Sequence, residues 1–316
     1  MAIKLVCEPG KVVTWDEFKQ YPEFSIAIDG YCHGRPRGSA SGLRLNINHH
    51  EEVDRTATRS SCEQALVLVK MGLYRRYQVN GEPTATLYVN DCDQDVVLAT
   101  YVLKYPRKAD RQKLKHLIRL EDLLDMSAGL YPVSNPRKSH LMKQLAWATA
   151  PYTDARLAGS LSRLSGGEML RLIEEMHRRL DRALRGRVPE PQFDTSFESQ
   201  ERKGWFLVRE TGAQSRLGMV NAGVEAFVSV LEEHGGRWRY ALGRLSQFIP
   251  FPIPHICAAL NAAEGIGPKN PDRWSGSENC GGSPRRRQSR LSPAKVARII
   301  DQTLERVRRQ VAAKRR

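Results

Sequence analysis

The spacing of apolar and polar residues predicts alternating strands and helices in the first third of the chain. Short apolar runs at residues 24–28, 43–47 and 85–89 are typical of buried strands. Residues 14–17 form a plausible helix start, and residues 58–73 and 96–103 carry apolar side chains at helical spacing. Strands that alternate with helices in this way predict an α/β fold with a mainly parallel sheet.

Helical spacing continues from about residue 114 to residue 184, where Ser165 and Glu168 form a capping box at a helix start. Strands are expected again at residues 205–208, 217–220, 226–231 and 238–242. Helices are expected at residues 253–263 and from Pro293 onward, because proline favours the first helical position. We therefore divide the chain into an α/β domain (1–110), a helical connector that completes it (111–188), a smaller α/β domain (189–290) and a basic C-terminal helix (291–316). The proline-containing segment 186–191 is the predicted boundary.

Composition limits the class of protein. A chain of 316 residues with 41% hydrophobic content can build two domains with apolar cores. The net charge of +15 favours polyanionic partners such as nucleotides or single-stranded nucleic acid, although a soluble surface with a basic tail explains it equally well. No apolar run approaches the roughly 20 residues that span a bilayer, so no membrane association is expected. Six scattered cysteines without a Cys-x-x-Cys pair favour a reducing, cytoplasmic location over a zinc ribbon or a disulfide framework.

Each of the three predicted strands in the first third is followed by acids or histidines. The residues concerned are Asp29, Asn48, His49, His50, Asp91, Asp93 and Asp95. Open α/β sheets build sites outside the carboxyl ends of their strands, so we expect these side chains to converge. Carboxylate and imidazole groups are suitable ligands for Mn²⁺ or Mg²⁺. The carboxylates at positions 91, 93 and 95 repel one another unless a cation or a proton neutralises them, and the alternative is a solvated acidic turn.

Two more distant segments add candidates. Asp125 follows an acidic pair in the helical region and is a weaker metal ligand, since an exposed helix face explains it about as well. Near the C-terminus, residues 276–283 are rich in glycine and serine and are predicted to form a loop. Gly281 and Gly282 would let the backbone approach a ligand closely, while Ser283 and Arg285 suit a phosphate. A flexible loop without a ligand is the alternative.

Taken together, these segments resemble the DHH phosphoesterase superfamily. Asn48, His49 and His50, followed by small hydroxyl residues at the next helix start, resemble its Asp-His-His motif. Asp29 resembles the acid of its preceding strand, Asp93 and Asp95 resemble its Asp-x-Asp motif, and the segment around Gly281 resembles the glycine-rich loop of its C-terminal associated domain. Three features depart from the family: Asn48 replaces an aspartate, Ser283 replaces a histidine, and the Asp-x-Asp motif follows the histidines. A circular permutation would preserve the site despite that order.

The resemblance implies a Mn²⁺- or Mg²⁺-dependent phosphodiesterase or nuclease that uses one or two ions. The implied metal ligands are Asp29, His49, Asp91, Asp93, Asp95 and Asp125. His50 and Asn48 are the implied catalytic residues, and Arg59, Gly281, Gly282, Ser283 and Arg285 would hold the phosphates of a nucleotide or a short single-stranded oligonucleotide. Because Asn48 brings no charge, the alternative is a catalytically weak or inactive DHH-like protein that binds nucleotides or nucleic acid. A third alternative is a scaffold that forms a homodimer through its basic C-terminal helix.

Overall fold

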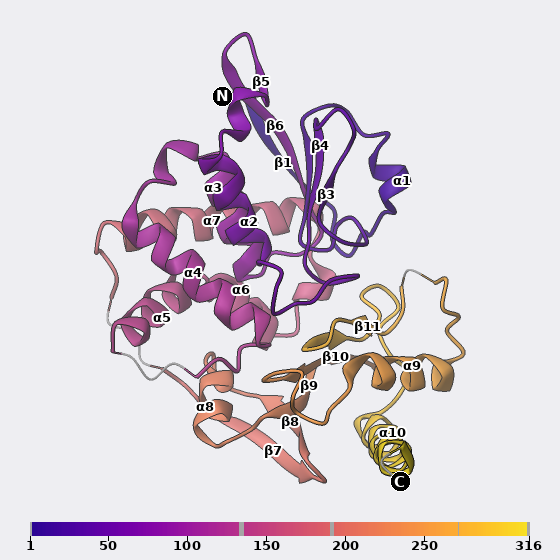
Figure 1. The fold of residues 1–316 in the computed structure, drawn as a ribbon. Helices are drawn as coiled ribbons and strands as arrows, with labels where there is room; N and C mark the ends of the chain where they lie inside the picture. Colours follow the sequence, from indigo (N-terminus) through magenta and orange to yellow (C-terminus); the bar gives the residue numbers. More distant parts are fainter. Residues whose placement is uncertain (1, 133–135, 190–192, 271, 315–316) are drawn as a thin grey trace. The chain divides into compact units, whose positions relative to one another are not determined.

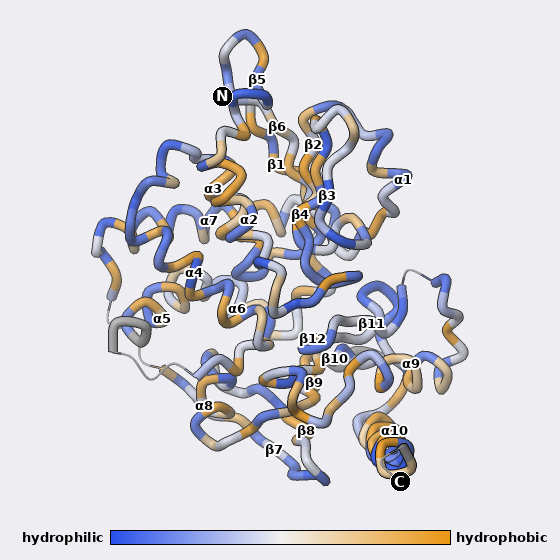
Figure 2. The backbone as a smooth tube through the Cα atoms, viewed as in Figure 1, coloured by the Kyte–Doolittle hydropathy of each residue, from blue (hydrophilic) through white to orange (hydrophobic). Residues whose placement is uncertain are grey.

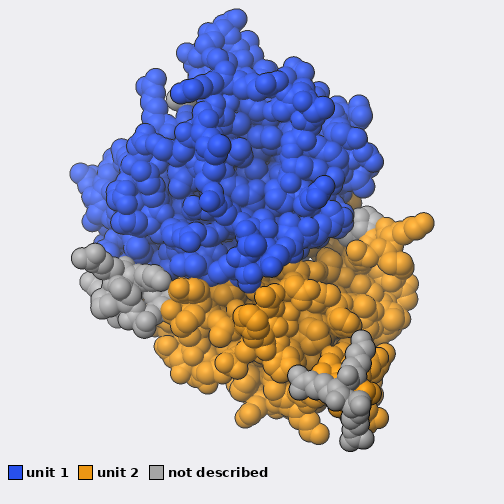
Figure 3. Space-filling view, viewed as in Figure 1, with its two compact units in different colours: residues 1–126, 133–155, 160–192 blue, residues 127–132, 156–159, 193–316 orange. Residues whose placement is uncertain are grey.

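The computed structural model describes residues 2–132, 136–189, 193–270 and 272–314. The chain divides into two compact units, which Figure 3 colours separately. Unit 1 comprises residues 1–126, 133–155 and 160–192, and unit 2 comprises residues 127–132, 156–159 and 193–316. The main division thus falls between residues 192 and 193. Part of the predicted boundary segment, residues 190 and 191, lies outside the described residues.

Unit 1 is built on a mainly parallel sheet, so the α/β fold is confirmed. Its path is β1 (Ala2–Cys7), β6 (Glu82–Val89), β2 (Ser25–Ile28), β4 (Arg44–Ile47) and β3 (Arg37–Gly38) (Figure 1). The first four strands run parallel, β3 is antiparallel to β4, and the short β5 (Gln78–Val79) is antiparallel to β6. Parallel strands place their carboxyl ends at one edge of the sheet, which is where the acidic and histidine residues follow β2, β4 and β6.

The larger helices of unit 1 share one apolar core with the strands. They are α2 (Ser61–Lys70), α3 (Gln94–Lys104), α4 (Gln112–Met126), α5 (Pro136–Ala148), α6 (Ala150–Leu157), whose last residues belong to unit 2, and α7 (Gly166–Leu184), with short 3-10 helices η1 (Leu73–Arg75), η2 (Pro106–Lys108) and η3 (Leu161–Arg163). Helix α3 is buried along almost its whole length, and Figure 2 shows it as a mostly apolar segment. On the opposite face of the sheet lies α1 (Trp15–Phe18), where Phe18 packs with Tyr21, Tyr31 and Tyr88.

Unit 2 contains a second, largely antiparallel sheet. Its strands are β7 (Phe197–Arg202), β8 (Trp205–Glu210), β9 (Ala226–His234), β10 (Arg237–Arg244), β11 (Ser275–Gly276) and β12 (Cys280–Gly282), in the order β11-β12-β10-β9-β8-β7. Among the described strands of this sheet, only β8 and β9 pair in parallel, and α8 (Ser215–Asn221) makes the crossover between them. Helices α9 (Ile253–Glu264) and α10 (Pro293–Lys314) pack their apolar sides onto a core that includes Trp205 and Tyr240.

Most predicted elements are confirmed, including the capping box at Ser165 and the helix that begins at Pro293. The strand predicted at residues 217–220 is wrong, because this segment belongs to α8. A four-residue apolar run does not distinguish a strand from a helix, whereas a parallel pair of strands requires a crossover, which a helix commonly supplies. The loop predicted at residues 276–283 is also wrong in part, since it contains β12 and the end of β11. Strands β1 and β7 and the short strands β3 and β5 were not predicted.

None of the helices formed by the described residues is long and apolar enough to cross a bilayer.

Candidate metal centre

The carboxyl ends of β2 and β4 bring the first candidates together. Ile28 at the end of β2 pairs with Ile47 at the end of β4, so Asp29 and the residues from Asn48 onward leave the sheet at the same level. Asp29 has φ of +48°, a left-handed conformation that aspartate adopts more readily than most residues. The sheet register and this turn therefore account for Asp29 lying next to the histidines.

Five side chains of unit 1 form what we call the carboxylate–histidine cluster. Its members are Asp29, His49, His50, Asp95 and Asp125. His49 Nε2 lies 2.8 Å from Asp125 Oδ2. The same nitrogen lies 3.3 Å from Asp29 Oδ1 and 3.6 Å from Asp95 Oδ2. His50 Nε2 lies 2.6 Å from Asp29 Oδ1. Asp29, His49 and Asp95 are at most 2% exposed, so the centre of the cluster is sealed from solvent.

Helix α2 is anchored to the cluster through its first backbone amides. The N–H groups of Ser61 and Cys62 donate to Asp95 Oδ2 and Oδ1 at 2.8 and 2.7 Å. The N–H of Ser60 donates to Asp122 Oδ1 at 2.7 Å. Carboxylates are favoured at a helix N-terminus, where the amides lack intrahelical partners and the helix dipole is positive. These bonds tie α2 to α3 and α4 and fix Asp95 beside His49.

Asn48 holds the loop that presents the two histidines. Its buried side chain accepts hydrogen bonds from the backbone N–H groups of His49 at 2.8 Å and His50 at 3.2 Å. Its Nδ2 group donates to Gly34 O at 2.9 Å, to Cys32 O at 3.3 Å and to Glu51 Oε2 at 2.7 Å. Both ends of the amide are thus used inside the loop, so the structure supports a positioning role for Asn48 rather than direct metal ligation.

The structure adds Arg55, which was not predicted as a site residue. Its side chain is buried and lies in the loop between β4 and α2. It donates from NH1 toward His50 Nδ1 at 3.0 Å and from NH2 to Asp125 Oδ1 at 2.8 Å. No sequence pattern distinguishes it from the predicted Arg59, which is exposed. Only the fold shows which of the two basic residues points into the cluster.

Buried carboxylates of the cluster and its surroundings raise one another's pKa. Burial, followed by the charge of Asp29, raises the pKa of Asp95 to about 6. Burial and the surrounding carboxylates raise the pKa of Asp93 and of Glu121 well above the usual range. Carboxyl groups that retain protons in this way signal excess negative charge, which a divalent cation would neutralise.

The two histidines partly offset that charge. For Asp29, burial alone would raise the pKa, but the adjacent His50 and His49 hold it well below the usual range. For His49, burial and the nearby Arg55 would lower the pKa, but Asp125 and Asp29 raise it to about 10. The surroundings that favour a proton on this imidazole also favour a metal cation there, because proton and cation compete for the same ring nitrogen.

The donor set fits a divalent ion. Both ring nitrogens of His49 and Nε2 of His50 are buried atoms without a hydrogen-bond partner, so their short contacts with carboxylates lack hydrogen-bond geometry. Neighbouring ligands at about 2.1 Å from a six-coordinate ion lie about 3 Å apart, close to the 2.8–3.6 Å between His49 Nε2 and the carboxylate oxygens. Two groups that share His49 could each hold an ion: Asp29 with His49 and His50, and His49 with Asp95 and Asp125. Imidazole with carboxylates suits Mn²⁺ better than the oxygen-preferring Mg²⁺.

Two of the other predicted ligands lie near the cluster but in different roles. Asp93 caps α3, since its Oδ1 accepts the N–H of Val96 at 3.0 Å. Asp91 is half-buried, and its Oδ1 accepts the N–H of the adjacent Cys92 at 2.8 Å. The alternating acids after β6 therefore do not share one face: Asp95 enters the cluster, while Asp93 starts the helix.

The predicted phosphate-binding residues near the C-terminus have structural contacts within unit 2. Strand β12, which contains Gly281 and Gly282, lies between β10 and β11 and pairs with both. A Cβ atom on Gly281 would lie 2.7 Å from Ile253 Cγ2, so close packing against α9 requires glycine there. The buried Ser283 Oγ accepts the N–H of Tyr240 at 3.0 Å. Arg285, just beyond, is half-buried.

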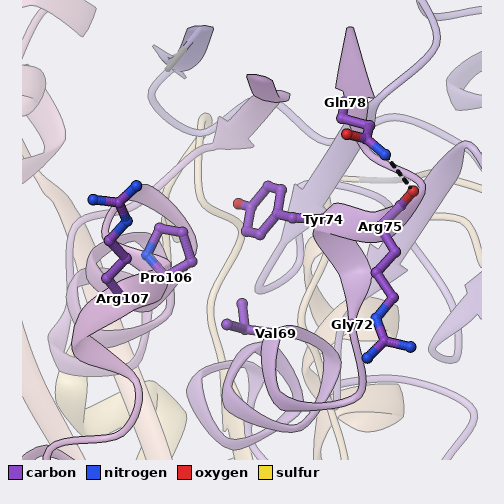
Figure 4. Close-up of a pocket in the computed structure, with 7 residues that line it drawn as sticks. All are labelled: Val69, Gly72, Tyr74, Arg75, Gln78, Pro106 and Arg107. Atoms are coloured by element: carbon purple, nitrogen blue, oxygen red, sulfur yellow. Dashed lines mark hydrogen bonds between the residues drawn. The ribbon is translucent and has the colours of Figure 1, made fainter. Parts of the chain in front are cut away.

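An open depression of about 470 Å³ lies elsewhere on unit 1. Figure 4 shows Tyr74 in its middle, with Val69 below, Pro106 and Arg107 on one side and Arg75 on the other. The Tyr74 hydroxyl donates to Leu103 O at 2.5 Å, so its polar end is used within the fold. None of its lining residues belongs to the carboxylate–histidine cluster.

Comparisons of the chain with family models, with curated proteins and with solved structures found no match. Function is therefore inferred from the geometry of the carboxylate–histidine cluster. That geometry offers one buried imidazole among three carboxylates, an adjacent second imidazole and a buried guanidinium. Such a set can hold a divalent cation and present a hydrogen-bond donor beside it.

Proposed function

We propose that the protein is a Mn²⁺- or Mg²⁺-dependent phosphoesterase of the DHH type that acts on a nucleotide or a short single-stranded oligonucleotide. The observation that carries the proposal is His49 Nε2, which lies within 3.6 Å of carboxylate oxygens of three aspartates and has no hydrogen bond of its own. The resemblance of Asn48, His49 and His50 to the family motif supports phosphoester chemistry over other uses of a metal.

The roles follow from the contacts. His49, Asp29, Asp95 and Asp125 would hold the ion. A divalent ion supplies Lewis acidity toward a phosphoryl oxygen and lowers the pKa of a water molecule. Asp95 is kept rigid by two backbone amides of α2, which reduces the reorganisation that binding requires. His50, beside the ligands, would donate a hydrogen bond to the phosphate or to the leaving oxygen.

The substrate class is supported by charge. The chain has a net charge of +15, which attracts phosphate-containing ligands. Arg59 lies exposed between the histidine loop and α2, and could contact a phosphate at the edge of unit 1. The glycines of β12 are not needed in this proposal, because their contacts are explained by the packing of unit 2.

A second function is favoured by Asn48. The leading residue of the family motif is an amide here, and its oxygen accepts two backbone N–H groups. Because Asn48 brings no negative charge, the case for a second metal ion is weaker. A DHH-like protein that binds a nucleotide without turning it over is therefore the alternative.

Metal-dependent hydrolysis tests both functions. Protein purified under chelation is supplied with Mn²⁺ or Mg²⁺ and assayed on bis-p-nitrophenyl phosphate, short oligonucleotides and cyclic dinucleotides. Asp29→Asn removes a buried carboxylate of the cluster, and Asp110→Asn is the matched control because Asp110 is exposed and pairs with Lys70. The proposal expects turnover that Asp29→Asn abolishes and Asp110→Asn preserves.

Two other outcomes are decisive. Nucleotide binding without turnover by any metal-loaded sample would favour the binding protein. Turnover that survives both Asp29→Asn and His49→Ala would overturn the proposed site, because the cluster would then be unnecessary for the chemistry.

A further inference from the structure

The two adjacent histidines differ in the surroundings of their ring nitrogens. His49 has no hydrogen-bond partner at either nitrogen. His50, by contrast, has the NH1 group of Arg55 3.0 Å from its Nδ1. The rings lie 4.7 Å apart, so they share one local environment but not one set of contacts.

The contact with Arg55 determines where His50 carries its proton. A guanidinium group has only N–H donors and no acceptor. In the neutral imidazole, Nδ1 of His50 is therefore the acceptor, which leaves the ring proton on Nε2. Nε2 is buried, lies 2.6 Å from Asp29 Oδ1 and points into the carboxylate–histidine cluster.

Arg55 is held firmly enough to impose this arrangement. Its NH2 group donates to Asp125 Oδ1 at 2.8 Å and to the backbone oxygen of Asp125 at 3.0 Å. The guanidinium is planar, so fixing one end against α4 also fixes the direction of the other. The Arg55 side chain is about 2% exposed, so solvent does not compete for these bonds.

We propose that Arg55 is a positioning residue that holds His50 in the Nε2–H tautomer, so that His49 alone ligates the metal and His50 is a hydrogen-bond donor. A nitrogen that carries a proton has no lone pair for a metal. The group of Asp29, His49 and His50 then loses one ligand. The group of His49, Asp95 and Asp125 remains complete, and Asp29 joins it. The structure thus favours one ion per chain.

The tautomer follows from the contacts alone, whereas the group that receives the His50 hydrogen bond rests on the proposed phosphoesterase function. In that function, Nε2–H would face a phosphoryl oxygen.

The tautomer is measured in metal-free protein by ¹H–¹⁵N NMR of histidine side chains at neutral pH. The His50 signals are assigned by their loss in His50→Gln. We expect an unprotonated Nδ1 and a protonated Nε2, and we expect Arg55→Met to replace this pattern with a mixture of tautomers. Arg59→Met is the matched control, because Arg59 is exposed, and should leave the spectrum unchanged.

A protonated Nδ1 in the wild-type protein would overturn the inference, as would a His50 spectrum that Arg55→Met does not alter. If Arg55→Met fails to fold, the wild-type spectrum still decides the tautomer. Arg55→Lys then tests the bridge, since an ammonium group lacks the planar fork that spans His50 and Asp125.

Metal binding provides the second readout. Free Mn²⁺ is measured by electron paramagnetic resonance during titration. We expect one Mn²⁺ per chain and an affinity loss in His49→Ala that exceeds the loss in His50→Ala by at least about tenfold, because losing a ligand costs more than the roughly 10–100-fold that losing an outer-shell residue costs. Equal losses in the two variants would overturn the division of roles. The tautomer measurement needs neither metal nor substrate, so it stands or fails apart from the hydrolysis assay.

Discussion

Glu210 is expected to stabilise unit 2 through a buried ionic contact. It lies at the end of β8, where Arg156 and Arg216 contact its carboxylate and Ser229 donates to Oε1 at 2.7 Å. Burial alone would raise the pKa of Glu210, but Arg216 and Arg156 outweigh it and lower the pKa from 4.5 to about 2. The contact joins the segment at residues 156–159 to β8, α8 and β9.

The magnitude follows from the pKa. At about 1.4 kcal/mol per pKa unit, the lowered value corresponds to about 3 kcal/mol of stability at pH 7. Because the folded pKa lies below the unfolded one, this stability is present above pH 4.5 and is lost as the pH falls toward 2. By pH 3, about 2 kcal/mol of it should be gone. Glu210→Gln should therefore cost about 3 kcal/mol at pH 7, in line with the cost of breaking a buried ion pair.

The assay is urea unfolding at pH 7 and pH 3, followed by the fluorescence of tryptophans such as the buried Trp205. Glu175→Gln is the control: Glu175 pairs with two arginines on the surface of α7, so its loss should change stability by less than about 0.5 kcal/mol. The reasoning is refuted if Glu210→Gln is as stable as the control at pH 7. It is equally refuted if the wild-type protein loses no more stability than Glu210→Gln between pH 7 and pH 3.

Three further predictions concern unit 1 and the glycines of unit 2. Asn48→Asp should destabilise the protein by about 2 kcal/mol in urea unfolding and should not raise activity in the hydrolysis assay. The reason is that the new carboxylate oxygen would face Glu51 and two carbonyl groups, all of which now accept hydrogen bonds from the amide. Higher activity without a loss of stability would contradict this and would mean that the chain only lacks the aspartate of the family motif. Burial lowers the pKa of His177 to about 3, so the unfolded chain binds a proton below pH 6.5 that the folded protein does not. Stability should therefore fall by about 3 kcal/mol more in the wild type than in His177→Asn between pH 7 and pH 4, and parallel losses in unfolding free energy would contradict this. Gly281→Ala should lower stability by about 1–3 kcal/mol through the clash with Ile253, and a variant of unchanged melting temperature would reopen a ligand role for this glycine.

The division of roles between the histidines has a consequence for the proposed chemistry. In the proposed site, a single ion held by His49 and three aspartates would leave His50 to act as a donor beside it. The contacts of both histidines depend on carboxylates that bind the first amides of a helix, as Asp95 binds those of α2. The active geometry would thus be set by helix capping as much as by the sheet.

The sequence by itself determined the α/β class, the strands that end before Asp29 and Asn48, and most helices. These features depend on local periodicity and on capping residues, which a short stretch of chain carries in itself. It also indicated that acids and histidines would meet at the strand ends, since parallel strands share an edge.

Only the tertiary structure decided which side chains meet. Asp125 contacts Arg55, 70 residues earlier in the chain, and Asp122 accepts the N–H of Ser60, which precedes α2 and lies 62 residues earlier. Conversely, Gly281 looks like a ligand-binding glycine in sequence but is required by the approach of β12 to α9. Contacts of this kind depend on the packing of elements that are distant in sequence. The local pattern that predicts a helix or a strand therefore carries no information about them.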